Sequence, residues 1–127
     1  MGQPGLTLDT GALIALERGS RRVAGYLATA RERGAIVTVP TPVVVEWWRG
    51  QRGPAARLLD GLVAEPLTLR LARVAGEALA RHGRGAGGTD AVVMASAAQR
   101  GDIVLTSDVT DLEPLREAFP GVRVLAV

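Results

Sequence analysis

Residues 6–16 read LTLDTGALIAL, an apolar run followed by a carboxylate and then a second apolar run. Residues 6–9 are predicted to form a short buried strand, and Gly11 permits a tight turn after it. A helix is predicted over residues 12–16, directly after this turn. Asp9 therefore stands at a strand-to-helix junction, and the rest of the chain repeats this alternation of strand and helix.

The remaining elements are assigned from apolar periodicity and from turn and capping residues. Strands are predicted at residues 35–39, 103–106 and 122–127, with a short edge strand at 67–69. Helices are predicted over residues 20–33, 43–49, 54–63, 71–82, 89–100 and 111–119. The predicted N-caps are Ser20, Thr41 and Thr89. This alternation favours a single α/β domain over residues 1–127, with three α/β/α layers and a central parallel sheet of four to five strands.

The composition excludes several classes of protein. The 127-residue chain has no cysteine and one histidine, and all 15 of its basic residues are arginine. The lack of cysteine excludes disulfides, thiolate zinc sites and cysteine nucleophiles. The lack of lysine excludes P-loop and Schiff-base enzymes, and the single histidine excludes a nuclease that works through a histidine pair. Because no apolar run approaches the roughly 20 residues of a membrane span, and the N-terminus lacks a signal pattern, we expect a cytoplasmic protein with no membrane partner.

Four carboxylates stand at the predicted junctions. Asp9 and Asp108 follow predicted strands, whereas Glu46 and Asp90 lie in the first turns of predicted helices. Such junctions meet at one crevice outside the carboxyl ends of parallel strands. Carboxylates crowded there repel one another unless a divalent cation neutralises them. We therefore predict a site for Mg²⁺ or Mn²⁺, in which Asp9 and Asp108 are fixed ligands at buried strand ends and Glu46 and Asp90 complete the site.

The predicted site suits the hydrolysis of a phosphodiester. This reaction requires a nucleophilic water, neutralisation of the phosphoryl oxygens and help for the leaving oxygen, which one or two bound Mg²⁺ ions supply. Attack by water leaves a 5′-phosphate and needs no 2′-hydroxyl. Arginines gather within residues 18–33 and 49–57. They either contact phosphates or form solvated helix faces.

The four acids occur in local contexts that together resemble one known family. The contexts are LDTGALIAL at 8–16, PVVVE at 42–46, DAVVMASAA at 90–98 and TSDVTD at 106–111. In this order they resemble the PIN-domain family, particularly the VapC-type toxins of bacterial toxin–antitoxin pairs, over essentially the whole chain. The resemblance implies that the metal-binding acids are Asp9, Glu46, Asp90 and Asp108. It gives supporting positions to Asp111 and to the Thr106 hydroxyl.

The resemblance also implies an activity and partners. It implies a Mg²⁺- or Mn²⁺-dependent endoribonuclease that acts on RNA, forms a homodimer and is blocked by an antitoxin. Many relatives have serine where Gly11 stands, so a hydroxyl contact is missing there unless Thr10 supplies it. The alternative is a non-catalytic PIN-like module that binds RNA or protein, which would be expected to lack one or more of the acids. A phosphotransfer domain is disfavoured because it normally needs a lysine.

Several other residues have predicted structural roles. Asp60 and Asp102 have no partner pattern and are predicted to lie on the surface. His82 ends a predicted helix, where it is expected to act as a cap or to be exposed. Trp47 and Trp48 are adjacent and point about 100° apart on a helix, so one is expected in the core. The other is expected to pack at the boundary, to contact a partner protein or to stack on a base. Asp111 is expected to be either a ligand or a helix N-terminal residue.

Overall fold

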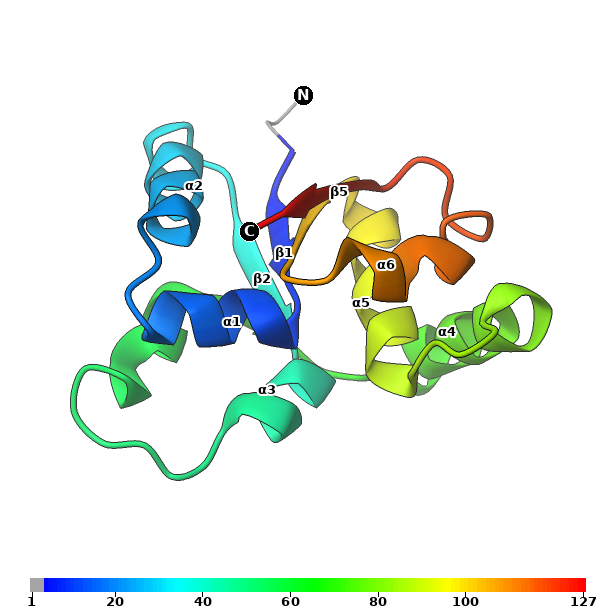
Figure 1. Ribbon diagram of the computed structural model, residues 1–127, viewed down its shortest axis with the longest axis horizontal. Helices are drawn as coiled ribbons and strands as arrows, with labels where there is room; N and C mark the ends of the chain where they lie inside the picture. The colour runs from blue at the N-terminus through cyan, green and yellow to red at the C-terminus, as the bar shows by residue number, and fades with distance from the viewer. Residues whose placement is uncertain (1–3) are drawn as a thin grey trace.

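The computed structural model describes residues 4–127 and consists of a parallel sheet with helices on both of its faces (Figure 1). The strands are β1 (Leu6–Leu8), β2 (Val37–Pro40), β3 (Val63–Glu65), β4 (Ile103–Thr106) and β5 (Arg123–Ala126). Their order across the sheet is β3-β2-β1-β4-β5, and every neighbouring pair is parallel. The predicted three-layer α/β/α fold with a central parallel sheet is therefore confirmed.

Helices cover the sheet on two sides, with α1 and α2 on one side of β1 and β2 and α4, α5 and α6 on the other (Figure 1). The α-helices are α1 (Thr10–Glu17), α2 (Arg21–Glu32), α3 (Thr41–Trp47), α4 (Leu69–His82), α5 (Gly88–Arg100) and α6 (Val109–Leu112). Two short 3₁₀ helices are η1 (Ala56–Gly61) and η2 (Glu113–Leu115). Within residues 4–127, the longest apolar helical stretch is too short to cross a bilayer.

The core is built around β1 and α5. Strands β1 and β2 are buried at every residue because helices cover both faces of the sheet. Helix α5 is buried continuously from Ala91 to Ala97, and its small side chains allow close packing against α4 and the sheet. Trp47 joins this core at 3% exposure, whereas Trp48 is 42% exposed, so the prediction that one of the two is a core residue is confirmed.

The segment between η1 and α4 differs from the prediction. The edge strand is β3 at Val63–Glu65, and the prediction of a strand at 67–69 was wrong. Proline follows β3 at once, and the Thr68 hydroxyl accepts a hydrogen bond from the Leu71 N–H at 3.1 Å, which starts α4. The predicted helix over 54–63 is reduced to η1 (Ala56–Gly61), and its last residue, Val63, begins β3 and pairs with β2.

Helix ends differ from the prediction at three further places. Ser20 is the N-cap of α2, as predicted. Thr41 and Thr89 were wrongly predicted as N-caps, since α3 begins at Thr41 itself and α5 begins one residue before Thr89. The Thr41 hydroxyl instead accepts a hydrogen bond from the Leu67 N–H. The predicted helix over 111–119 is replaced by the short α6 and η2, which begin earlier because an aspartate caps α6.

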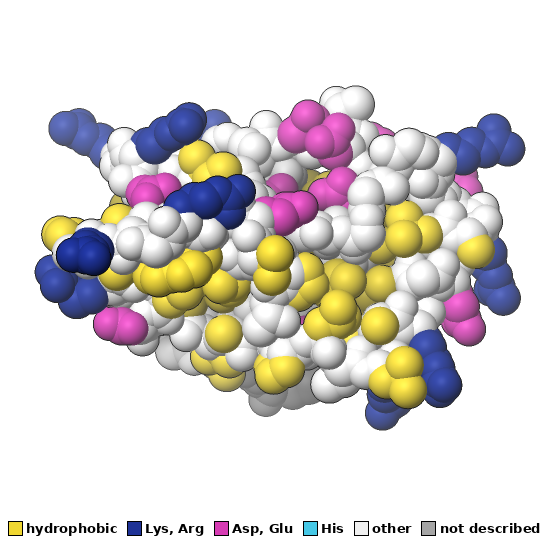
Figure 2. All heavy atoms as spheres, turned by 90° about the horizontal axis from the view of Figure 1, so that it is seen from below, with side chains coloured by type: hydrophobic (Ala, Val, Ile, Leu, Met, Phe, Trp, Pro, Cys, Tyr) yellow, Lys and Arg dark blue, Asp and Glu magenta, His cyan; other side chains and the backbone are white. Residues whose placement is uncertain are grey.

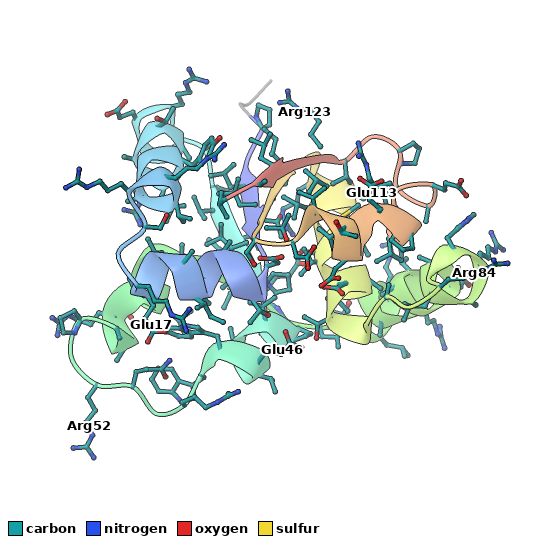
Figure 3. All side chains as sticks on the ribbon, viewed as in Figure 1. Glu17, Glu46, Arg52, Arg84, Glu113 and Arg123 are labelled. Atoms are coloured by element: carbon teal, nitrogen blue, oxygen red, sulfur yellow. The ribbon has the colours of Figure 1, made fainter. Side chains whose placement is uncertain are left out.

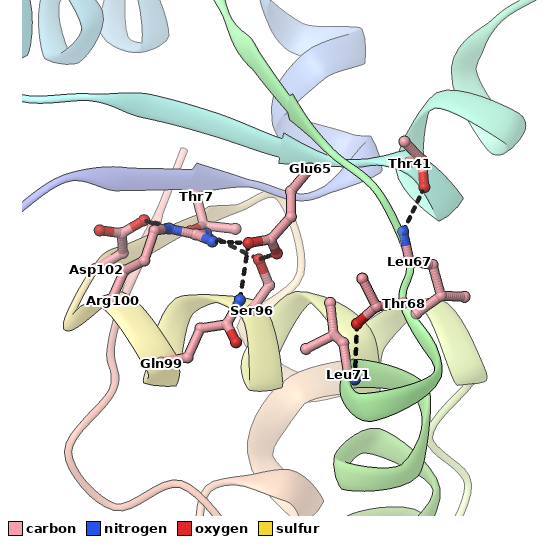
Figure 4. Close-up of polar contacts among 10 residues, drawn as sticks. All are labelled: Thr7, Thr41, Glu65, Leu67, Thr68, Leu71, Ser96, Gln99, Arg100 and Asp102. Atoms are coloured by element: carbon pink, nitrogen blue, oxygen red, sulfur yellow. Dashed lines mark hydrogen bonds and ion pairs between the residues drawn. The ribbon is translucent and has the colours of Figure 1, made fainter.

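Asp102 was predicted to lie on the surface, and that prediction was wrong, because its side chain is only 5% exposed. Figure 4 shows its polar contacts. It accepts hydrogen bonds from the Thr7 hydroxyl at 2.8 Å and from Arg100 Nε at 3.0 Å. The same guanidinium donates to Glu65 at 2.5 Å and to the Ser96 hydroxyl at 2.8 Å. This Arg100 network joins β1, β3, α5 and the start of β4 beneath the sheet.

His82, the last residue of α4, is partly exposed. Its Nδ1 lies 3.3 Å from the Glu117 carboxylate, which follows η2. The ring is thus placed at the end of a helix, as predicted, and its partner there is a carboxylate beyond the helix.

Candidate active site

Asp9 is held rigidly at the carboxyl end of the central strand. It follows β1 directly and is the N-cap of α1, where its Oδ1 accepts a hydrogen bond from the Ala12 N–H at 2.8 Å. Its residue is only 9% exposed. Burial raises the pKa of the Asp9 carboxyl, and the nearby Glu46 charge raises it further, whereas hydrogen bonds from Thr106 and from backbone N–H groups lower it. On balance the surroundings of Asp9 disfavour its ionised form.

Asp90 faces the same region from the first turn of α5. Its Oδ2 accepts a hydrogen bond from the Gly87 N–H at 3.4 Å. Burial is the main reason that the pKa of Asp90 is raised, and the charges of Asp111, Asp9 and Glu46 raise it as well. Asp90 therefore interacts electrostatically with three other carboxylates, those of Asp9, Glu46 and Asp111. Such a gathering of charges is expected where parallel strands end.

Glu46 is exposed on α3 and is tied to α1. Its Oε1 accepts a hydrogen bond from the Thr10 hydroxyl at 2.5 Å, and Figure 3 shows Glu46 beside the beginning of α1. Trp47 Nε1 donates to Glu17 Oε1 at 3.1 Å and fixes the end of α3 against the end of α1. Thr10 directly follows Asp9 in the chain. The hydrogen bonds of Glu46 and Trp47 to α1 therefore hold the Glu46 carboxylate on the side of α3 that faces Asp9.

Asp108 is placed differently from the prediction. The buried run of β4 ends at Thr106, and Asp108 lies beyond it as an exposed residue, so the prediction of a buried strand end was wrong for this acid. Its Oδ1 accepts a hydrogen bond from the Asp111 N–H at 3.3 Å and caps α6. The Thr106 hydroxyl accepts one from the Asp108 N–H at 3.0 Å. In this part of the chain, the charge of Asp111 raises the pKa of Asp90.

The convergent acids have the chemistry of a site for a hard cation. Within residues 4–127, no three acidic or histidine side chains already stand close enough to enclose a metal ion. All the donors are carboxylate oxygens, which Mg²⁺ and Mn²⁺ prefer. The pKa values of Asp9 and Asp90 are raised chiefly by burial and further by neighbouring carboxylates, and a bound cation would offset both effects. Binding would require the exposed Glu46 and Asp111 side chains to turn toward the two more buried acids.

The face of the molecule drawn in Figure 2 carries charges of both signs. Figure 2 shows acidic side chains near the middle of its upper margin and basic side chains toward both ends of the molecule. A band of apolar side chains crosses the molecule below the acids in the same view.

Ser107 is a residue that the sequence analysis missed. A Cβ atom on Gly11 would lie 1.8 Å from the Ser107 Oγ and 2.8 Å from the Ser107 Cβ. The Ser107 side chain therefore fills the space that a side chain at position 11 would occupy, next to the start of α1. The neighbouring hydroxyl, that of Thr10, donates to Glu46. The absence of a side chain at Gly11 and the serine at 107 are two parts of one packing arrangement.

This arrangement predicts that Gly11→Ser lowers stability by about 1–3 kcal/mol, the usual effect of overpacking. Adding Ser107→Gly should restore most of the loss, and adding Ser107→Ala should restore less, because the Cβ at position 107 still clashes. Urea unfolding of the single and double variants measures the coupling between the two positions. If Gly11→Ser has the same effect in the parent protein and in the Ser107→Gly variant, the prediction is contradicted.

Comparison with known proteins gives one family and several structures of similar fold. The family model for the PIN domain matches residues 6–112. The DNA-bound VapBC complex of Salmonella typhimurium is similar with a TM-score of 0.73 at 19% identity, covering 98% of each chain. VapBC2 of Rickettsia felis, bound to a DNA fragment from its promoter, gives 0.74 at 12% identity, covering 96% of this chain and 98% of the other. FitAcB of Neisseria gonorrhoeae gives 0.67 at 19% identity, covering 94% and 96%. No curated protein matches the chain.

Proposed function

The chain belongs to the PIN domain family, and on this basis we propose that it is a Mg²⁺- or Mn²⁺-dependent endoribonuclease, the toxin of a toxin–antitoxin pair. The observation that carries the proposal is the convergence of Asp9, Glu46, Asp90 and Asp111 at one end of the sheet, with the pKa values of Asp9 and Asp90 raised by burial. Buried carboxyl groups whose pKa is shifted by burial together with neighbouring charges are typical of functional sites.

We assign different parts to the residues of this site. Asp9, fixed by the α1 N-terminus, is the rigid ligand, and Glu46 and Asp90 complete the ligand set. Asp108 is the fourth proposed ligand, and Asp111, whose N–H donates to the Asp108 carboxylate, is an additional candidate. Thr10 and Thr106 are positioning residues, because their hydroxyls bond to Glu46 and to Asp9 respectively. A bound divalent cation would supply the water activation and the neutralisation of phosphoryl charge that hydrolysis needs.

The proposal includes two protein partners. A cognate antitoxin is supported by the recurrence of VapBC and FitAB complexes among structures of this fold. The homodimer is proposed from the family resemblance alone. A cytoplasmic location follows from the proposed RNA substrate. The second candidate, a non-catalytic binding module, is less well supported, because all the acids expected for catalysis are present and are held by defined hydrogen bonds.

Cleavage of RNA by purified, antitoxin-free protein tests the activity. With Mg²⁺ or Mn²⁺ we expect products with 5′-phosphate ends, no cleavage in EDTA, and continued cleavage when a single 2′-deoxynucleotide stands at the scissile position. Asp90→Asn should lower the rate by at least about a hundredfold, as for loss of one group that stabilises transition-state charge. The matched control is Asp60→Asn, since Asp60 is an exposed aspartate on η1, away from the site. An inactive parent protein with both ions would exclude the proposed catalysis.

Thermal melting tests metal binding separately from catalysis. We expect Mn²⁺ to raise the melting temperature, because a ligand at a hundred times its Kd stabilises the folded state by about 2.7 kcal/mol. The rise should be absent in Asp90→Asn and unchanged in Asp60→Asn. If the melting temperature of the parent protein does not respond to Mn²⁺, the acids do not form a metal site.

A further inference from the structure

A groove lies between α2 and the sheet, at the amino ends of the strands. It has a volume of about 590 Å³. Its floor includes Leu6 on β1 and Ile103 on β4, which are in register with each other and with Arg123 on β5. Leu125 points to the same face as Arg123, because residues two apart on a strand share a face. The floor is therefore an apolar row across three neighbouring strands, bounded by a guanidinium group at one end.

The opposite wall is one face of α2 and its C-terminal end. Lining residues Arg22, Tyr26, Thr29 and Arg33 recur at spacings of three or four, which places them on one side of the helix. The four arginines that line the groove are Arg21, Arg22, Arg33 and Arg123. No acidic residue lines it, and none of the four guanidinium groups forms an ion pair with a carboxylate of residues 4–127.

The groove is separate from the acidic site. Asp9 follows the last residue of β1, whereas three of the four strand residues that line the groove, Leu6, Ile103 and Arg123, are the first residues of β1, β4 and β5. Figure 3 shows the same separation, with Arg123 near the top of the molecule and Glu46 near the bottom of the ribbon. The four arginines therefore have no direct contact with the proposed hydrolysis.

We propose that this groove, the α2–β5 groove, binds an acidic segment of a partner protein whose apolar side chains fill the floor while its carboxylates meet the arginines. Charge complementarity selects this occupant. A second copy pairing through the same face would bring the two sets of four arginines together, which like-charge repulsion disfavours. RNA phosphates would meet the arginines but would gain nothing from an aliphatic floor, and Tyr26 is the one aromatic residue in the lining available for base stacking.

A synthetic peptide in which leucine alternates with glutamate is the probe for this proposal, with fluorescence anisotropy as the readout. The double variant Arg33→Glu/Arg123→Glu should weaken binding by about fivefold or more, because charge reversal turns two attractions into repulsions. The control is Arg73→Glu, an exposed arginine on α4 across the sheet, which should bind like the parent. A peptide with lysine in place of glutamate should prefer the double variant.

Three results would overturn the proposal. One is equal peptide affinity for the parent and the double variant, with circular dichroism showing both folded. Another is a short single-stranded RNA that binds the parent but not the double variant, while both proteins bind the peptide equally well. The third is a difference in sedimentation between the parent and the double variant which shows that the groove is a contact between two copies of the chain. RNA hydrolysis by the double variant should equal that of the parent, so failure of the nuclease proposal would be seen independently.

Discussion

Asp9→Asn should lower the rate of RNA hydrolysis at least about a hundredfold. The same substitution should stabilise the metal-free protein at neutral pH. Activity is lost because the amide is a neutral and poor ligand for Mg²⁺. Stability rises because the substitution removes a buried charge that lies close to Glu46. Asparagine retains the Oδ1 acceptor that caps α1, so the hydrogen bond from the Ala12 N–H is kept.

The pH dependence of this effect has a definite sign. Burial raises the pKa of Asp9 above its ordinary value of 3.8, so the folded state holds the proton more tightly than the unfolded state does. The contribution of Asp9 to stability therefore falls as pH rises from the unfolded-state pKa through the higher folded-state pKa. At neutral pH the full destabilisation is present, and below the unfolded-state pKa it is absent.

Urea unfolding in EDTA at several pH values measures this contribution. The gain in stability from Asp9→Asn should be largest at neutral pH and should shrink toward the acidic end of the range. Asp9→Ala is the matched control, since it removes the charge but also the cap, which is worth about 1 kcal/mol. It should therefore be less stable than Asp9→Asn. A gain that is the same at every pH, or a loss at neutral pH, would contradict this account.

Arg100→Met should destabilise the fold by about 2–4 kcal/mol, because it leaves two largely buried carboxylates without their cationic partner. Arg100 is 25% exposed at its side chain and pairs with Asp102 at 5% and Glu65 at 21% exposure. Methionine fills a similar volume, so the loss reports the missing charge and hydrogen bonds rather than a cavity. A less severe loss is expected for Asp102→Asn, which leaves the Arg100–Glu65 pair in place.

The control for this prediction is Arg116→Met. Arg116 pairs with Glu113 at 3.0 Å on the surface, with side chains 48% and 53% exposed. Such exposed pairs contribute about 0–1 kcal/mol, so this variant should unfold close to the parent protein. The free energy of unfolding from urea titration separates the two cases, and similar losses in both variants would show that the Arg100 network has no special role.

The candidate site was predictable where local sequence determines the position of the side chain. Asp9 directly follows an apolar run and Asp90 stands in the first turn of an apolar helix, and both are where the sequence placed them. Asp108 and Asp111 are three residues apart, and their local contexts do not tell which carboxylate faces the site. That choice depends on the turn after β4, in which Asp108 is used as the cap of α6.

Long-range contacts account for the features that the sequence did not reveal. Asp102 has the local context of a surface aspartate, but its buried partner Thr7 lies 95 residues earlier in the chain. The packing of Ser107 against Gly11 and the floor of the α2–β5 groove likewise combine residues from opposite ends of the sequence. The parallel sheet was predictable because it rests on a repeated alternation of elements rather than on any single contact.

The central position of β1 has a consequence for how the protein folds during synthesis. One edge of β1 pairs with β2, about thirty residues later, but its other edge pairs with β4 at Ile103–Thr106. Non-local parallel pairing forms late because the loop-closure entropy must be overcome first. A nascent chain can therefore pair the second edge of β1 only after Thr106 has emerged from the ribosome, and it completes the sheet only after β5 (Arg123–Ala126) has followed. Asp9 meets Thr106 and the loop that carries Asp111 at that stage, so an unfinished chain beside the ribosome should be unable to cut RNA.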